Sequence, residues 1–114
     1  MNSIVLKIGE KEVGFLATAG VFMRYKNSFG SDFYEDMMNC KSCGQKGLFA
    51  QTVIERYIWV LAKTYEEVIG AKEPIPPCQQ WLDSFELSEF KYDEIYDKLQ
   101  PIISDNLKVD RKNE

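Results

Sequence analysis

The stretch that decides the fold is LFAQTVIERYIWVLAKTYEEVI, residues 48–69. Fourteen of its 22 residues are apolar, and they cover most of the circumference of a helix. A helix with so little polar surface has to be covered on several sides. We therefore expect residues 48–69 to form a central helix around which the rest of the chain packs.

Two short β-prone runs precede this helix, at residues 4–8 and 12–16. Apolar residues alternate in both runs, and the Gly9-Glu10-Lys11 segment between them is typical of a turn. These runs predict a β-hairpin, which needs a partner for its apolar face because an isolated hairpin is only marginally stable.

Two short helices are predicted between the hairpin and the central helix. Thr18 is a suitable N-cap for the first, and Gly30 is a suitable end. Asp32 is placed to begin the second. The polar, glycine-containing residues 39–47 predict a loop.

Beyond the central helix, the proline-rich residues 70–77 predict a break. Pro77 suits the first turn of a further helix. That helix carries apolar residues at positions i, i+3, i+4 and i+7, namely Cys78, Trp81, Leu82 and Phe85. Residues 92–107 predict a last amphipathic helix, and Pro101 predicts a kink or a restarted helix near Gln100.

Together these elements predict an α+β fold, mostly α. An N-terminal β-hairpin precedes a four- to five-helix bundle around the central helix 48–69. We expect a single globular domain over residues 1–107 and a charged C-terminal tail over residues 108–114.

The charge balance and the absence of histidine argue against two classes of function. Lys and Arg number 14 and Asp and Glu number 18, so the net charge is −4, and the chain has no histidine. An acidic balance argues against binding to nucleic acid. The absence of histidine removes the usual general base, His-activated nucleophiles and imidazole metal ligands, so we expect no enzymatic activity.

The expected location is the cytoplasm. The longest apolar run, residues 57–62, is far shorter than the roughly 20 residues that span a bilayer, so we expect no membrane insertion. The N-terminal residues do not resemble a signal peptide. Three cysteines, an odd number, fit reduced thiols better than a disulfide framework.

The motif Cys40-Lys41-Ser42-Cys43 is compatible with half a zinc site, with a redox pair, or with incidental loop cysteines. Zinc normally takes four ligands, and only Cys78 remains to complete a set. A redox motif needs a βαβ context that the pattern does not offer. We favour incidental cysteines, with no metal and no cofactor; a metal site shared across an oligomer remains the main alternative.

The order of segments resembles a known family. YIWVLAKT at 57–64, a proline-bearing break, QWLDSF at 80–85 and Ile95-Tyr96 before a proline-interrupted end are similar to the tail assembly chaperones of long-tailed phages and prophages of Gram-positive bacteria. The resemblance covers nearly the whole chain, most closely residues 48–103. The loop that holds Cys40 and Cys43 departs from the family pattern.

The resemblance implies a non-enzymatic protein that binds the tape measure protein, keeps it soluble and helps to recruit tail tube subunits. It implies action in the host cytoplasm and absence from the finished virion. Many relatives also have a longer product made by ribosomal frameshifting, and a homo-oligomer is compatible with this reading. The alternative is a small cysteine-containing regulatory or interaction module of a phage, with or without bound metal.

The aromatic residues are more numerous than a small core needs, and aromatics anchor interfaces. A surface that binds a helix lays an apolar groove against an apolar stripe. The candidate partner-binding residues are Trp81, Leu82 and Phe85, beside Tyr96. Packing inside the core would account for the apolar character of the same four residues equally well.

Overall fold

The structure is a computed structural model that describes residues 2–42 and 48–103, with side chains described for residues 2–39 and 51–103. Within these residues an antiparallel two-stranded hairpin precedes five helices, with 56% helix and 15% strand. The predicted α+β fold, mostly α, is confirmed. The predicted tail, residues 108–114, lies outside the described residues.

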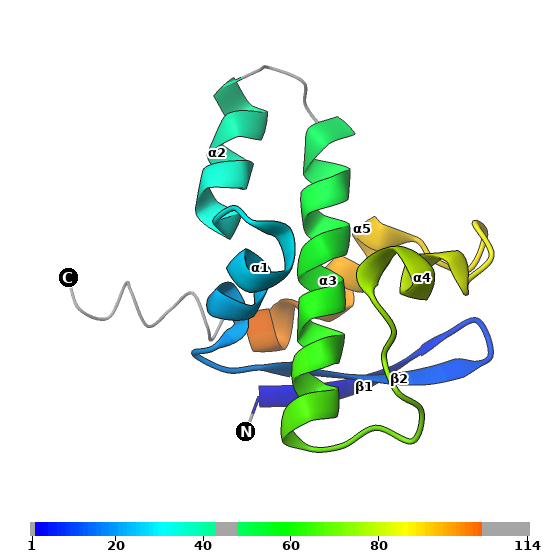
Figure 1. Ribbon diagram of the computed structural model, residues 1–114. Helices are drawn as coiled ribbons and strands as arrows, with labels where there is room; N and C mark the ends of the chain where they lie inside the picture. The colour runs from blue at the N-terminus through cyan, green and yellow to red at the C-terminus, as the bar shows by residue number, and fades with distance from the viewer. Residues whose placement is uncertain (1, 43–47, 104–114) are drawn as a thin grey trace.

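The central helix stands in the middle of the molecule (Figure 1). In this view α1 and α2 lie to its left, α4 lies to its right, and the hairpin crosses its lower half. Helix α3 contacts β2 and each of the other described helices, as the sequence predicted. The elements are β1 (Asn2–Ile8), β2 (Lys11–Ala17), α1 (Val21–Phe29), α2 (Phe33–Ser42), α3 (Leu48–Val68), α4 (Cys78–Asp83) and α5 (Tyr92–Lys98).

The hairpin is longer and its turn is tighter than predicted. The strands pair in an unbroken register from Asn2–Ala17 to Ile8–Lys11. Only Gly9 and Glu10 are left to form the turn, not three residues. Gly9 has a φ of 63°, the conformation that glycine favours at the first central position of a type II′ turn.

The predicted N-cap of α1 is wrong, because Gly20 occupies that position and α1 begins at Val21. The Thr18 hydroxyl accepts a hydrogen bond from the Gly20 N–H at 3.1 Å, so it stabilises the turn before the helix instead. The predicted end is confirmed. Gly30 has a left-handed φ of 79°, and its N–H donates to the Lys26 carbonyl at 2.8 Å.

Three further boundaries differ from the predicted ones. Helix α2 continues to Ser42, so residues 39–42 are helical rather than loop, while residues 43–47 lie outside the described residues. Pro77 is the N-cap of α4 rather than its first helical residue. Helix α4 ends at Asp83, so Phe85 lies beyond it.

The predicted interruption in the last helical segment is confirmed. Helix α5 ends at Lys98, and residues 100–103 are helical again. Pro101 lacks the N–H that a continuous helix would need at this point.

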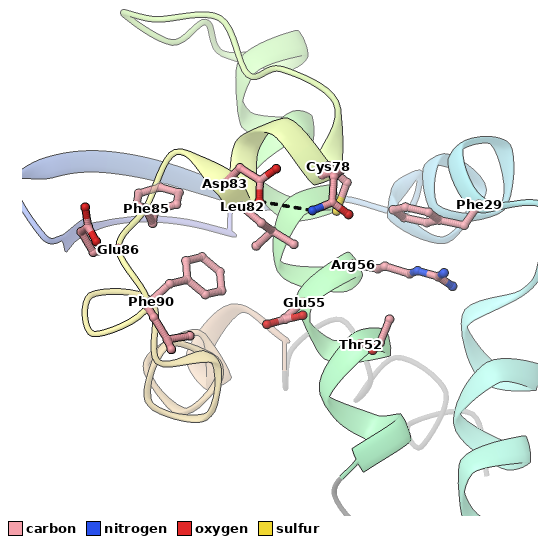
Figure 2. Close-up of a pocket in the computed structure, with 12 residues that line it drawn as sticks. Phe29, Thr52, Glu55, Arg56, Cys78, Leu82, Asp83, Phe85, Glu86 and Phe90 are labelled. Carbon is pink, nitrogen blue, oxygen red and sulfur yellow. Dashed lines mark hydrogen bonds between the residues drawn. The ribbon is translucent and has the colours of Figure 1, made fainter.

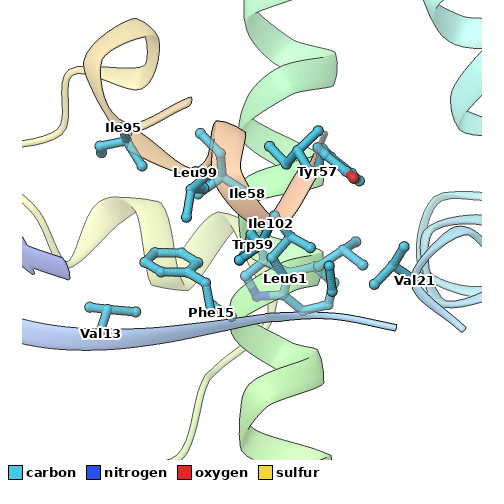
Figure 3. Close-up of a cluster of buried hydrophobic side chains, with 14 of the residues drawn as sticks. Val13, Phe15, Val21, Tyr57, Ile58, Trp59, Leu61, Ile95, Leu99 and Ile102 are labelled. Atoms are coloured by element: carbon cyan, nitrogen blue, oxygen red, sulfur yellow. The ribbon is translucent and has the colours of Figure 1, made fainter. Parts of the chain in front are cut away.

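The core lies between α3, the hairpin and α5 (Figure 3). Phe15 on β2, Ile58 and Leu61 on α3 and Leu99 after α5 are completely buried. The buried Thr64 hydroxyl donates to the Val60 carbonyl at 2.7 Å, which satisfies its hydrogen-bonding need within the helix.

Many of the aromatic residues pack against one another, and most of these are buried or half-buried; Tyr34 is 50% exposed. One cluster joins α1, α2 and α3, with ring centroids 4.6 to 6.1 Å apart. Such contacts stabilise beyond simple burial of area. The surplus of aromatic residues is therefore largely used inside the fold. The cluster consists of Phe22, Tyr25, Phe29, Phe33, Tyr34, Tyr57 and Trp59.

The segment between α3 and α4 is fastened to α3 by hydrogen bonds. The Trp59 indole N–H donates to the Pro76 carbonyl at 2.8 Å, and the Lys63 ammonium donates to the Ile75 carbonyl at 3.0 Å. The Glu66 carboxylate accepts from the Ile75 N–H and pairs with Lys63 at 2.7 Å. Partial burial opposes ionisation of Glu66, but the bonds from Lys63 and Ile75 outweigh it and lower its pKa.

Helix α3 and β2 approach each other closely at Gly14. A Cβ built on Gly14 would lie 2.5 to 2.7 Å from atoms of the Tyr65 ring, well inside van der Waals contact. Glycine at position 14 therefore leaves room for the Tyr65 ring, which a larger residue would displace.

We predict that Ile58→Ala or Leu61→Ala lowers the free energy of unfolding by about 2–5 kcal/mol, because each leaves a cavity in a fully buried site. Val68→Ala, at a position 48% exposed near the end of the same helix, is the control and has little effect. Urea denaturation measures the three values. Unchanged stability of both core variants would show that α3 is peripheral to the fold.

We also predict that Gly14→Ala destabilises the protein by about 1–3 kcal/mol, since overpacking displaces the Tyr65 ring. Adding Tyr65→Ala makes room for the new methyl group. Gly14→Ala should therefore cost less in the Tyr65→Ala background than alone, and a double-mutant cycle of thermal melts measures this coupling. Equal costs in the two backgrounds would contradict the steric explanation.

Candidate functional site

A groove of about 580 Å³ lies between α3 and the segment from α4 to residue 90 (Figure 2). Side chains from α3, α4 and the following loop line it, and Phe29 at the end of α1 closes one side. The lining residues are Phe29, Thr52, Glu55, Arg56, Cys78, Gln79, Leu82, Asp83, Phe85, Glu86, Leu87 and Phe90.

The wall between α4 and residue 90 is made of aromatic rings. Trp81 packs edge-to-face against Phe85 and Phe90, with centroids 5.2 and 5.6 Å away. The Lys11 ammonium lies 5.0 Å from the centroid of the Phe85 ring, which ties this wall to the hairpin. Phe85 thus keeps its place in the fold although it lies outside α4.

The predicted partner-binding residues do not form one surface. Trp81 is 4% exposed and Phe85 is 9% exposed, so the chain itself covers most of both side chains. Leu82 and Phe85 line the groove, whereas Trp81 lies behind it. Tyr96 is half-buried on α5 and packs against the core away from the groove lining.

Leu87 is the groove residue that the sequence interpretation missed most clearly. Its side chain is 94% exposed, more than any other large apolar side chain in the described part of the chain. It lies in the loop between α4 and α5 at the edge of the groove. A signal for it exists in the sequence, because Leu87 stands alone between Glu86 and Ser88 with no helical stripe to join.

Arg56 is the groove's basic residue, and other contacts already engage its charge. Its guanidinium lies 3.8 Å from Asp36 and 4.9 Å from the centroid of the Phe29 ring. Asp36 also accepts hydrogen bonds from Tyr25 at 2.7 Å and Ser31 at 2.8 Å. Burial, followed by the hydrogen bond to Asp36, raises the pKa of Tyr25 to about 12, so its hydroxyl stays protonated at neutral pH.

Carboxylates dominate the remaining charge of the groove. Glu55 comes from α3, Asp83 from the end of α4, and Glu86 from the loop that follows. Asp83 accepts a hydrogen bond from Gln79 at 3.3 Å, the dashed line in Figure 2. The side chains of Asp83 and Glu86 are exposed. The groove therefore combines an apolar floor with an acidic rim, which suits a partner that is apolar and positively charged.

A second hollow, of about 790 Å³, lies on the other side of Trp81 and Phe85, between the hairpin and the segment after α3. Its lysines Lys7, Lys11 and Lys72 are matched by three glutamates, at positions 10, 12 and 73. Because its charges balance, it offers less selectivity for a charged partner than the first groove does.

Cys78 lines the groove and packs partly against the core, and its thiol is a poor nucleophile. Burial raises its pKa to about 11; Arg56 lowers it and Glu55 raises it, both by smaller amounts. The reactive thiolate is therefore scarce at neutral pH. Among the residues with described side chains, no three His, Cys, Asp or Glu residues are grouped as a metal site needs. The side chains of Cys40 and Cys43 lie outside that set, so the interpretation of this pair stays a prediction.

Comparison with protein-family profiles, curated proteins and solved structures finds no match to this chain. Within residues 2–42 and 48–103, no helix has the length and hydrophobicity needed to cross a bilayer.

We predict that the double variant Cys40→Ser/Cys43→Ser stays folded and keeps partner binding, because residues 39–47 include no other metal-ligand residues. Cys78, then the remaining thiol, should react with iodoacetamide only slowly at neutral pH. Its rate should rise as pH approaches about 11 rather than the ordinary 9.0, because the raised pKa delays thiolate formation. Mass spectrometry measures the rate, with urea-unfolded protein as the control. Unfolding of the double variant with loss of one zinc would instead establish a metal site.

Proposed function

We propose that this protein is a tail assembly chaperone of a phage or prophage, which binds the tape measure protein and keeps it soluble before tail assembly. The role is non-catalytic and belongs to the host cytoplasm, and the protein is absent from the finished virion. Recruitment of tail tube subunits is the second part of this role. The order of sequence segments over residues 48–103 supports the proposal.

The observation that carries the proposal is the half-apolar groove beside α3. Its floor includes Leu82 and Phe90, and Leu87 stands almost fully exposed at its edge. Exposed apolar groups beside a concave surface are typical of a site where an apolar partner binds. A groove of this kind can take side chains from the apolar stripe of a helix.

The physical task fits the remaining features of the chain. A very long amphipathic helical protein exposes apolar stripes that aggregate unless they are covered. Covering them requires a binding surface, whereas keeping the complex dispersed requires charge. The net charge of −4 provides repulsion between complexes.

We predict that co-expression with the tape measure protein of the same phage keeps that protein soluble and that the two co-purify. Because the contact is mainly apolar, the complex should survive about 1 M salt, where the Debye length falls to about 3 Å. Sedimentation of the lysate followed by pull-down at low and high salt measures both effects. An unrelated acidic helical protein of similar size is the control. A tape measure protein that stays insoluble with this chain in excess would refute the assignment.

A further inference from the structure

Among the residues that the structure describes, the lining of the groove carries three carboxylates, of Glu55, Asp83 and Glu86, and one cation, Arg56. Asp36 and Phe29 engage the guanidinium of Arg56 from the side of α2 and α1. On the opposite side of the groove, Asp83 and Glu86 are exposed to solvent. Asp83 lies at the end of α4, and Glu86 lies in the loop that follows. The carboxylates of Asp83 and Glu86 therefore attract a positively charged group that enters the groove on their side.

Apolar side chains from three separate parts of the chain lie beneath this rim. Phe29 at the end of α1 closes one side of the groove, Leu82 comes from α4 and Phe90 comes from the loop before α5, and all three are half-buried. Leu87 adds apolar surface at the edge with almost no cover from the chain itself. The combination of an apolar floor and an acidic rim matches the shape of a lysine or arginine side chain, which has an apolar stem and a charged end.

We propose that the groove binds one short stretch of a helix whose apolar stripe is flanked by lysine or arginine. This rests on the proposed function, and such a stretch then belongs to the tape measure protein. A volume of about 580 Å³ accommodates a few side chains from neighbouring turns of a helix. The groove therefore contacts one short stretch of the partner helix rather than its whole length. Apolar contact supplies the affinity, and the rim selects the sign of the flanking charges.

The first test measures binding of two labelled synthetic helices with the same leucine stripe, one flanked by lysine and the other by glutamate. Fluorescence anisotropy with the full chain should show about tenfold tighter binding of the lysine helix. The variant Asp83→Lys/Glu86→Lys should reverse this preference. Both positions are exposed, so the fold is expected to survive, and circular dichroism checks this.

The matched control is Glu35→Lys/Asp97→Lys. It makes the same change in net charge at exposed positions on α2 and α5 that do not line the groove. This variant should keep the preference for the lysine helix. Loss of the preference in the control to the same extent would show that overall charge governs binding, and it would overturn the proposal.

A second variant tests the apolar edge. Leu87→Ser should weaken binding of the lysine helix several-fold without affecting stability, because Leu87 is 94% exposed. Met23→Ser, at a position on α1 that is 65% exposed and outside the groove, should leave binding unchanged. Equal affinities of the Leu87→Ser protein and the unmodified protein would overturn the proposal.

Two further experiments test whether something other than a partner helix occupies the groove. A dimer of the unmodified protein that Leu87→Ser dissociates in analytical ultracentrifugation would show that a second copy fills the groove. Tighter binding of the lysine helix when Lys108, Arg111 and Lys112 are changed to Gln would show that the chain's own end competes for it. The first result would overturn the assignment to a partner helix, whereas the second would support it, because competition requires that the helix and the chain's own residues bind the same site.

The closing experiment separates this inference from the proposed function. Asp83→Lys/Glu86→Lys and the unmodified protein are each co-expressed with the tape measure protein, and the affinity of each complex is then measured at low salt, where the rim charges are not screened. A soluble tape measure protein with the unmodified protein, together with weaker binding by the variant at low salt, supports both proposals. Equal affinities of the two proteins at low salt refute the groove and leave the chaperone function standing. Failure of the unmodified protein refutes the chaperone function itself.

Discussion

Residues 57–62 of α3 are six consecutive side chains that are each 6% exposed or less, and successive helical residues point in different directions. This part of the helix therefore has to be surrounded by protein. The hairpin, the α1–α2 pair, α4 and α5 supply the cover, and each of these helices contacts α3. The groove follows from the same arrangement, because its walls are elements that meet at α3 without filling the space between them.

The fold class and most elements could be predicted from the sequence because apolar periodicity reports burial directly. The boundaries that failed depend on competing local contacts. Thr18 is a good helix-capping residue, but its hydroxyl bonds the Gly20 N–H in the preceding turn. Phe85 continues the apolar spacing of α4, yet the Ser84 N–H and hydroxyl both donate to the Trp81 carbonyl as the helix ends. The spacing of apolar residues alone does not show whether an aromatic residue such as Phe85 lies inside the helix or just after its end.

The candidate site was harder to predict than the fold, for a physical reason. An apolar stripe such as Trp81, Leu82 and Phe85 has the same period whether it faces the core or a partner. Other parts of the chain cover most of Trp81 and Phe85, while Leu82 and the small exposed part of Phe85 line the groove. The exposed residue was the isolated Leu87. Its position outside any periodic pattern is the feature that distinguishes it from core leucines.

The segment that joins α3 to α4 fixes one wall of the groove within the fold itself. Its Ile75 and Pro76 carbonyls accept hydrogen bonds from Lys63 and Trp59, so the start of α4 is fixed relative to the helix that forms the opposite wall. The conformational entropy of this segment is therefore lost during folding rather than on binding. The proposed partner would therefore meet a wall that is already in place at the start of α4. For that wall, we expect no closing movement to slow association.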